Sequence, residues 1–305
     1  MLASRVSVFI LGLLALTSLT VAADDLEDYV GVYGAENGQR YMQPLADVMI
    51  ANMNGGLFHS AYIPREGFHF CVGVEGMVSP IGDDQRTFTA TTEAPFAPEQ
   101  TLEVPTVFGD TQGAQASGTG GTVYYFPGGF DVQQMPAAVP QLTIGSIYGT
   151  EGILRFTATE TNETIGKVEL LGLGARHSIS QYFSNSPVDL AASFLWQSFT
   201  VGEIVDASAL SFGVQASRST GILTGYVGLA FESGTLDLDY EQEVAGTTQA
   251  VSYELEADNS VRLTLGATLD LSVLRLHADY SLAAQNTIGI GFGVGTWPRA
   301  KGGAQ

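Results

Sequence analysis

The chain has 305 residues, of which 37 are glycine and one is cysteine, and it carries 12 lysine and arginine residues against 32 aspartate and glutamate residues. A formal net charge of −20 excludes the basic surface that binding to nucleic-acid phosphates requires. A single cysteine excludes an internal disulfide. We therefore expect no nucleic-acid partner, and no sequence motif indicates a cofactor.

The first 23 residues have the features of a secretory signal peptide. Arg5 is followed by an apolar stretch over residues 6–20, and Val21, Ala22 and Ala23 supply small side chains at a cleavage position. We predict a cleaved signal peptide over 1–23. The alternative is a membrane anchor, but the apolar stretch is short for a span of about 20 residues, and no later stretch is long enough for a membrane helix.

Residues 24–54 are predicted to be a helical N-terminal segment. Apolar residues recur at helical spacing over residues 41–50, Pro44 is tolerated in a first helical turn, and Asn54, Gly55 and Gly56 end the pattern. Strands are then predicted over 57–63, 68–75 and 86–90. Residues 91–140 contain Pro95, Pro98, Pro105, Pro127, Pro136 and Pro140, so we predict one long surface or lumen loop there rather than a linker between domains.

From residue 141 apolar and polar residues alternate steadily, most clearly over residues 261–282. Val261, Leu263 and Leu265 alternate with Arg262 and Thr264, and the parity changes near residues 271–273. Because successive side chains of a strand point to opposite faces, this is a hairpin of two strands, each about ten residues long. Such strands suit a barrel that faces lipid with its apolar side and the lumen with its polar side.

The predicted fold is therefore all-β: an antiparallel transmembrane β-barrel of about 12 to 14 strands with a short N-terminal helical segment. The barrel is expected over residues 55–297 and a C-terminal tail over 298–305. The helical segment would plug the lumen or lie at its periplasmic mouth, or be a packing helix without a gating role. The competing fold is an exported soluble β-sandwich or small β-barrel that binds a ligand, in which alternation also occurs.

Short motifs along the chain resemble a bacterial family of unknown function that is identified as an outer-membrane protein. They are YMQP at 41–44, PTVFG at 105–109, PGG at 127–129 and LGLGARHSISQY at 171–182. More loosely, the chain is similar to outer-membrane transporters of hydrophobic compounds, which also carry a helical segment before the barrel. The resemblance implies the outer membrane of a Gram-negative bacterium as location and the lipid bilayer and a small hydrophobic ligand as partners. Residues 298–305 after Trp297 depart from the usual aromatic barrel end.

Charged and histidine residues on the predicted polar faces are the candidate lumen-lining residues. They are His59, His69, Glu75, Arg155, Arg176, Asp189, Arg262, Asp270, Arg275, His277 and Asp279. In a narrow barrel such groups pair across the lumen, and in a wide one they line a pore and set its selectivity. The histidines match no metal-ligand motif such as HExxH, so we interpret them as polar lumen residues and predict no metal site.

The predicted function is a monomeric channel or transporter for small, hydrophobic solutes. The alternative is a structural or adhesion barrel with a closed, charge-paired lumen. A barrel hydrolase is disfavoured, because the chain has no G-x-S-x-G motif and adjacency of His177 and Ser178 does not define a catalytic triad. That class would require Ser178 or another serine within reach of a histidine.

Overall fold

The computed structural model describes residues 33–160, 167–184, 186–202, 204–244 and 247–297. The signal peptide predicted over 1–23, the first part of the helical segment and the tail over 298–305 lie outside the described residues. The one α-helix in the described part of the chain, α2, spans Ala35–Met53. No helix in these ranges is long and apolar enough to cross a membrane.

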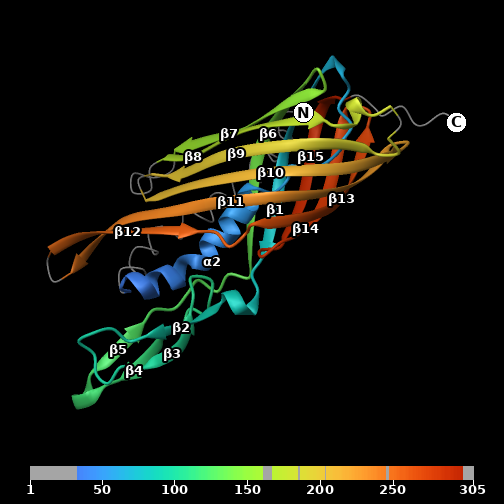
Figure 1. Cartoon of the computed structure of the whole chain (residues 1–305). Helices are drawn as coiled ribbons and strands as arrows, with labels where there is room; N and C mark the ends of the chain where they lie inside the picture. Colours follow the sequence, from blue (N-terminus) through green and yellow to red (C-terminus); the bar gives the residue numbers. More distant parts are fainter. Residues whose placement is uncertain (1–32, 161–166, 185, 203, 245–246, 298–305) are drawn as a thin grey trace, which may run out of the picture.

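Ten strands of the described residues close into an antiparallel barrel (Figure 1), which confirms the predicted all-β barrel with an N-terminal helix. Neighbours in the wall follow chain order except where short elements intervene, and the last strand pairs with the first. The barrel strands are β1 (Glu66–Pro80), β6 (Gln134–Ile147), β7 (Thr150–Glu160), β8 (Lys167–Ser178), β9 (Asp189–Val201), β10 (Val205–Thr220), β11 (Leu223–Val244), β13 (Val261–Leu271), β14 (Leu274–Leu282) and β15 (Thr287–Thr296).

The wall has ten strands, so the prediction of 12 to 14 is too high, because several strand-like segments lie outside it. Two short hairpins stand outside the barrel, β2 (Thr87–Thr91) with β3 (Thr101–Pro105) and β4 (Ala114–Ser117) with β5 (Val123–Phe126). The strand predicted over 57–63 is wrong, because these residues form an irregular segment instead. A further strand, β12 (Thr247–Glu256), pairs only with the far half of β11.

The apolar side chains of the barrel strands face outward, as the alternation in the sequence predicted. On β14 and β15 the exposed large apolar side chains are Leu276, Tyr280, Leu282, Ile288, Ile290, Phe292 and Val294, with Ile290 63% exposed. The alternate residues, from His277 to Ser281 on β14 and from Thr287 to Gly295 on β15, are buried and are polar or glycine. Large apolar side chains are exposed in the same way on the other barrel strands. An apolar belt of this extent is a surface for lipid rather than for water.

Helix α2 lies at one end of the barrel, beside the two hairpins (Figure 1). Tyr41, Met42 and Ile50 of α2 are completely buried and join a core with Leu236 of β11 and Phe126 of β5. Short 3₁₀ turns, η1 (Asp83–Gln85), η2 (Thr119–Gly121) and η3 (Ser180–Tyr182), interrupt the connections. Apolar packing thus fixes α2 and the segment that follows it against the barrel.

A plugged lumen and a methionine pocket as the candidate functional site

The chain that leaves α2 fills the barrel lumen. All residues from 54 to 61 are buried, and the wall binds their backbone directly. The guanidinium of Arg155 on β7 donates hydrogen bonds to the carbonyls of Met53, Gly55 and Gly56 at 3.0, 2.9 and 3.0 Å. A buried carbonyl without a donor would lower stability by about 1–3 kcal/mol, so Arg155 stabilises the entry of this segment, which we call the plug (residues 54–63).

The middle of the plug is held by a second buried arginine. Arg176 on β8 donates to the Ser60 carbonyl, lies 2.8 Å from the His59 Nε2 atom, and pairs with Glu151 at 2.6 Å. Thr268 donates to the His59 carbonyl at 2.7 Å, and the Ala61 N–H donates to Ser217 at 2.8 Å. The plug is therefore hydrogen-bonded to several sides of the wall.

Most of the remaining candidate residues pair with one another or with polar groups inside the barrel. His69 lies 3.1 Å from Glu151, His277 lies 2.7 Å from Glu75, Arg275 lies 2.7 Å from Asp270, and Tyr226 donates to Asp279 at 3.0 Å. Arg262 pairs with Glu232 at 2.6 Å and donates to the Ala51 carbonyl at 2.7 Å. The ring of His59 stacks on that of His277, with 5.7 Å between centroids.

Two candidates are placed differently from the rest. His59 belongs to the plug and not to a strand, because residues 57–63 make their hydrogen bonds to inward side chains of the wall. Asp189 lies at the first position of β9 and is only partly buried. Glu151 and Glu232 were missed, although Glu151 shares the inward face of β7 with Arg155 and the two-residue period could have identified it.

Little space remains between plug and wall. Two polar cavities of about 10 Å³ flank the plug, one beside Glu232 and Arg262 and one beside Cys71 and His277. Each has room for about one water molecule. Together with the hydrogen bonds of the plug, these small cavities describe a lumen that the plug occupies over the described residues.

The wall parts between β6 and β7 on the side of α2. Their pairing runs from Ile147 and Thr150 to Gln141 and Arg155 and stops there. Beyond that point β6 continues along β1 as far as Gln134, and β7 continues along β8 as far as Glu160. We call this gap in pairing the open seam; within the described residues it leaves one edge of β6 and one edge of β7 without a strand partner.

Two prolines explain why β6 tolerates an open edge. Pro136 and Pro140 are four residues apart, so their backbone nitrogens point to the same edge of the strand. Proline has no N–H and is accommodated where the nitrogen faces away from a paired strand. Since β1 pairs along this whole stretch, the edge without donors is the one that faces the open seam.

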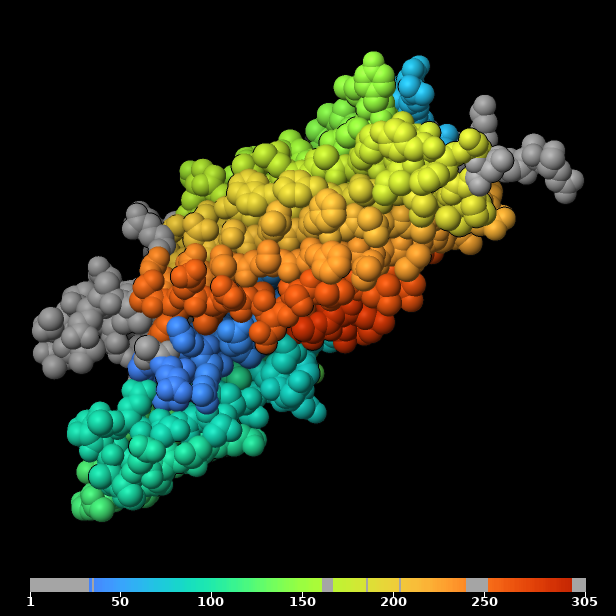
Figure 2. All heavy atoms as spheres, in the orientation of Figure 1, coloured from blue at the N-terminus to red at the C-terminus, as the bar shows by residue number. Residues whose placement is uncertain are grey.

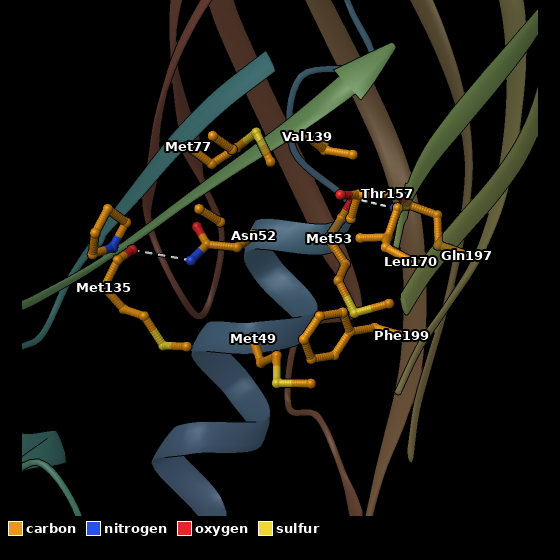
Figure 3. A pocket seen from close by; sticks show the side chains of 13 residues that line it. Met49, Asn52, Met53, Met77, Met135, Val139, Thr157, Leu170, Gln197 and Phe199 are labelled. Atoms are coloured by element: carbon orange, nitrogen blue, oxygen red, sulfur yellow. Dashed lines mark hydrogen bonds between the residues drawn. The ribbon is translucent and has the colours of Figure 1, made fainter. Parts of the chain in front are cut away.

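A methionine-lined pocket lies behind the open seam, between α2 and the wall (Figure 3). Its volume is about 60 Å³. Met77 and Met135 approach from β1 and β6, Leu170 and Phe199 from β8 and β9, and α2 lies between them (Figure 3). The pocket residues are Met49, Asn52, Met53, Met77, Met135, Pro136, Ala137, Ala138, Val139, Thr157, Leu170, Gln197 and Phe199.

The amide side chains of this methionine pocket are already hydrogen-bonded within the protein. Asn52 donates to the Met135 carbonyl at 3.0 Å and accepts from Ser79 at 2.9 Å. Gln197 donates to the Met53 carbonyl and accepts from Arg155 at 3.3 Å. These amides close the lumen side of the pocket and leave an apolar interior.

The described residues do not assemble a metal site, and His177 and Ser178 do not form a pair. Among them, no three His, Cys, Asp or Glu side chains are placed to hold a metal ion. His177 points outward and bonds to Thr150 at 2.7 Å and Tyr182 at 2.9 Å, whereas the neighbouring Ser178 is buried on the inner face. Adjacent residues of one strand face opposite sides, so Ser178 and His177 do not act on one another.

The family model DUF6588, described as a family of unknown function, matches residues 3–296. The chain belongs to this family. No curated protein matches it. The membership confirms the resemblance found in the sequence motifs and gives no activity.

Solved structures similar to the chain include outer-membrane proteins. A loop-deletion mutant of OmpT, an outer membrane protein of Vibrio cholerae, is 11% identical, with 75% of this chain and 98% of that chain covered and a TM-score of 0.28. The toluene transporter TodX of P. putida is 12% identical, with 78% and 69% covered and a TM-score of 0.27. The toluene transporter TbuX of Ralstonia pickettii is 8% identical, with 82% and 93% covered and a TM-score of 0.25.

Proposed function

We propose that this protein binds small apolar molecules in the methionine pocket and exchanges them with the surrounding membrane through the open seam. The observation that carries the proposal is the coincidence of the two features. The one place where the described barrel wall has two unpaired strand edges is also where an apolar cavity lies directly behind the wall.

The lining defines the class of ligand. Four methionines and Phe199 supply soft, adaptable apolar contacts, and Asn52 and Gln197 have their hydrogen bonds satisfied within the protein. Thr157 supplies the one hydroxyl among the lining side chains, so a ligand with several hydrogen-bonding groups would leave most of them unpaired, which costs free energy. The ligand is therefore a compact hydrocarbon or aryl compound without polar substituents.

The open seam is the route, because the plug fills the lumen. Phe156 and Leu171 beside the seam point outward and are exposed, as lipid-facing residues are. Further along the same two strands Glu160, Lys167 and Glu169 follow, which marks the edge of the lipid belt. An apolar molecule that leaves the pocket here enters lipid without crossing polar lumen groups.

The location follows from the predicted signal peptide over 1–23 and the apolar belt. We place the protein in the outer membrane of a Gram-negative bacterium, as a monomer without enzymatic activity. Three of the four connections at the end opposite α2 are two-residue turns, at 148–149, 221–222 and 272–273; the fourth, over 179–188, is longer. Short turns face the periplasm in bacterial barrels. We therefore place α2 and the hairpins on the extracellular side of the membrane, with the plug running from them into the lumen.

Binding of fluorobenzene tests the proposal. Fluorobenzene has no hydrogen-bond donor and reports binding through ¹⁹F line broadening with purified protein in detergent. Met135→Trp fills the pocket and should abolish the broadening, and Val294→Trp, which adds the same side chain on the lipid face, should not. Equal broadening with both variants, or tighter binding of benzyl alcohol than of fluorobenzene, would contradict the proposal.

A closed structural barrel is the second candidate, and the filled lumen favours it. This candidate predicts no saturable fluorobenzene binding, so the same titration separates the two. Planar-bilayer recordings add a common check, because both candidates predict no steady ion conductance. Stable open channels would show that the plug leaves the lumen in a membrane and would restore the prediction of a channel.

A further inference from the structure

A second and larger cleft lies at the rim of the barrel, on the outer side of α2. Its volume is about 630 Å³. Its walls come from α2, from the connection after β1, and from the loops that follow β12 and β14. In Figure 2 the blue atoms of α2, the teal atoms after β1 and the orange-red atoms of the last strands meet at this rim. We call it the rim cleft.

Hydrogen bonds between side chains and backbone fasten the walls of the rim cleft to one another. Gln43 of α2 donates to the Glu256 carbonyl at 2.8 Å, and Asp47 accepts from the Asp258 N–H at 2.8 Å. Gln285 accepts from Gln85 at 2.6 Å and donates to the Pro80 carbonyl at 2.9 Å. The rim cleft is therefore preformed, as small-molecule sites usually are.

The charge of the lining excludes anionic ligands. Asp47, Asp84 and Asp258 face a single cation, Arg40, among the residues that line the rim cleft. Burial raises the pKa of the Asp47 carboxyl, although the Asp258 N–H and the Gln43 amide donate to it. The carboxylates of Asp84 and Asp258 belong to exposed residues and are the acceptors that a ligand meets first.

Donors and apolar surface complete the lining. Arg40 uses two of its nitrogens on Glu36 and the Thr89 carbonyl, and a guanidinium has five N–H donors, so it retains donors for a ligand. The amide of Asn286 lies on the opposite wall. Pro44, Ile81 and Phe88 present apolar surface between these polar groups.

We propose that the rim cleft binds a neutral saccharide. A sugar ring needs both donors and acceptors at its edge and apolar surface on its faces, and the rim cleft offers all three. An organic cation without acceptor groups would be attracted by the carboxylates but would leave the donors of Arg40 and Asn286 unused. The rim cleft borders residues 40, 43, 44 and 47 of α2, whereas the methionine pocket borders residues 49, 52 and 53, so the two sites are separate.

Saturation-transfer NMR on the full chain in detergent tests this, with glucose, galactose and N-acetylglucosamine as neutral probes and glucuronate and spermidine as charged ones. We expect a saturation-transfer signal from at least one neutral sugar. For both charged probes we expect no more signal than in a sample without protein. Ala284→Trp, at an exposed position on the wall of the rim cleft, should abolish the sugar signal. Gln112→Trp, an exposed position outside it, should not.

Three results would overturn the assignment: no transfer to any neutral sugar, transfer to spermidine in preference to the sugars, or equal sugar signals from the Ala284→Trp and Gln112→Trp variants. A gel with and without boiling shows that each variant is folded. Because fluorobenzene binding is measured on the same samples, failure here leaves the proposal for the methionine pocket standing, and the reverse holds as well.

Discussion

The barrel wall parts at two places on the side of α2, and the two are built differently. Pairing of β11 with β13 ends at Phe231 and Val261, but β11 then pairs with β12 from Thr235 onward. Tyr253 and Leu255 of β12 are buried in the core that contains α2. At the open seam between β6 and β7, no strand of the described residues takes the corresponding place.

A buried arginine stands at each parting and binds the C-terminal end of α2 or the residues just after it. Arg155, in the last β6–β7 pair, donates to the carbonyls of Met53, Gly55 and Gly56. Arg262, beside the end of the β11–β13 pairing, donates to the Ala51 carbonyl. The same device therefore fixes the helix on both sides. The two partings differ in what occupies them. An added strand, β12, lies at one, and two prolines and the methionine pocket lie at the other.

Removal of Arg155 should have the largest effect. Arg155→Leu loses five donated hydrogen bonds and leaves buried carbonyls unpaired, so we expect a loss of about 3–5 kcal/mol in the free energy of unfolding. A urea titration in lipid vesicles measures it. Arg218→Leu, at an exposed position of β10, is the control and should change stability little. Equal effects of the two changes would mean that Arg155 does not hold the plug.

The parting between β11 and β13, which β12 fills, should contribute to stability through the packing of β12 on α2. Leu255 is 3% exposed, and Leu255→Ala should cost about 2–3 kcal/mol, near the lower end for buried leucines because the rim can relax. Leu282→Ala on the outward face of β14 is the matched change and should cost less. If Leu255→Ala leaves the urea midpoint unchanged, β12 does not anchor α2.

The open seam should narrow when its edge regains donors. Pro136→Val with Pro140→Val restores two N–H groups on β6, and each new backbone bond would contribute about 1 kcal/mol. If β7 pairs with them, we expect fluorobenzene affinity to fall about tenfold. Pro127→Val, outside the barrel strands, is the control. If amides of β7 become protected from hydrogen exchange but the affinity for fluorobenzene is unchanged, the ligand does not enter through the open seam.

The alternation of side chains in the sequence predicted which way most residues face, but it could not predict how the strands pair. Period-two patterns such as that of residues 261–282 correctly separate outward Leu263 and Leu265 from inward Arg262 and Thr264, because the facing of a side chain is a local property of a strand. Residues 57–63 were misassigned as a strand, because a segment that fills a lumen is buried on nearly all sides and its sequence does not show that it lacks a strand partner.

The open seam itself could not be predicted, because it depends on where pairing between β6 and β7 stops. Register is a relation between two strands and a single strand does not contain it. Pro136 and Pro140 were visible in the sequence, but they indicated a loop, and only the pairing of β6 with β1 shows that they lie on a strand edge. The strand count was too high for a related reason, since the hairpins and β12 have strand patterns without belonging to the closed wall.

Amide hydrogen exchange of the folded barrel in lipid vesicles tests the difference between the two partings most directly. Residues 156–160 of β7 are paired on one side only, whereas residues 235–238 of β11 are paired on both sides. We predict that alternate amides of residues 156–160 exchange fast while those of residues 235–238 are protected. Equal protection of the two stretches would show that the wall is closed at both places and would contradict the lateral route.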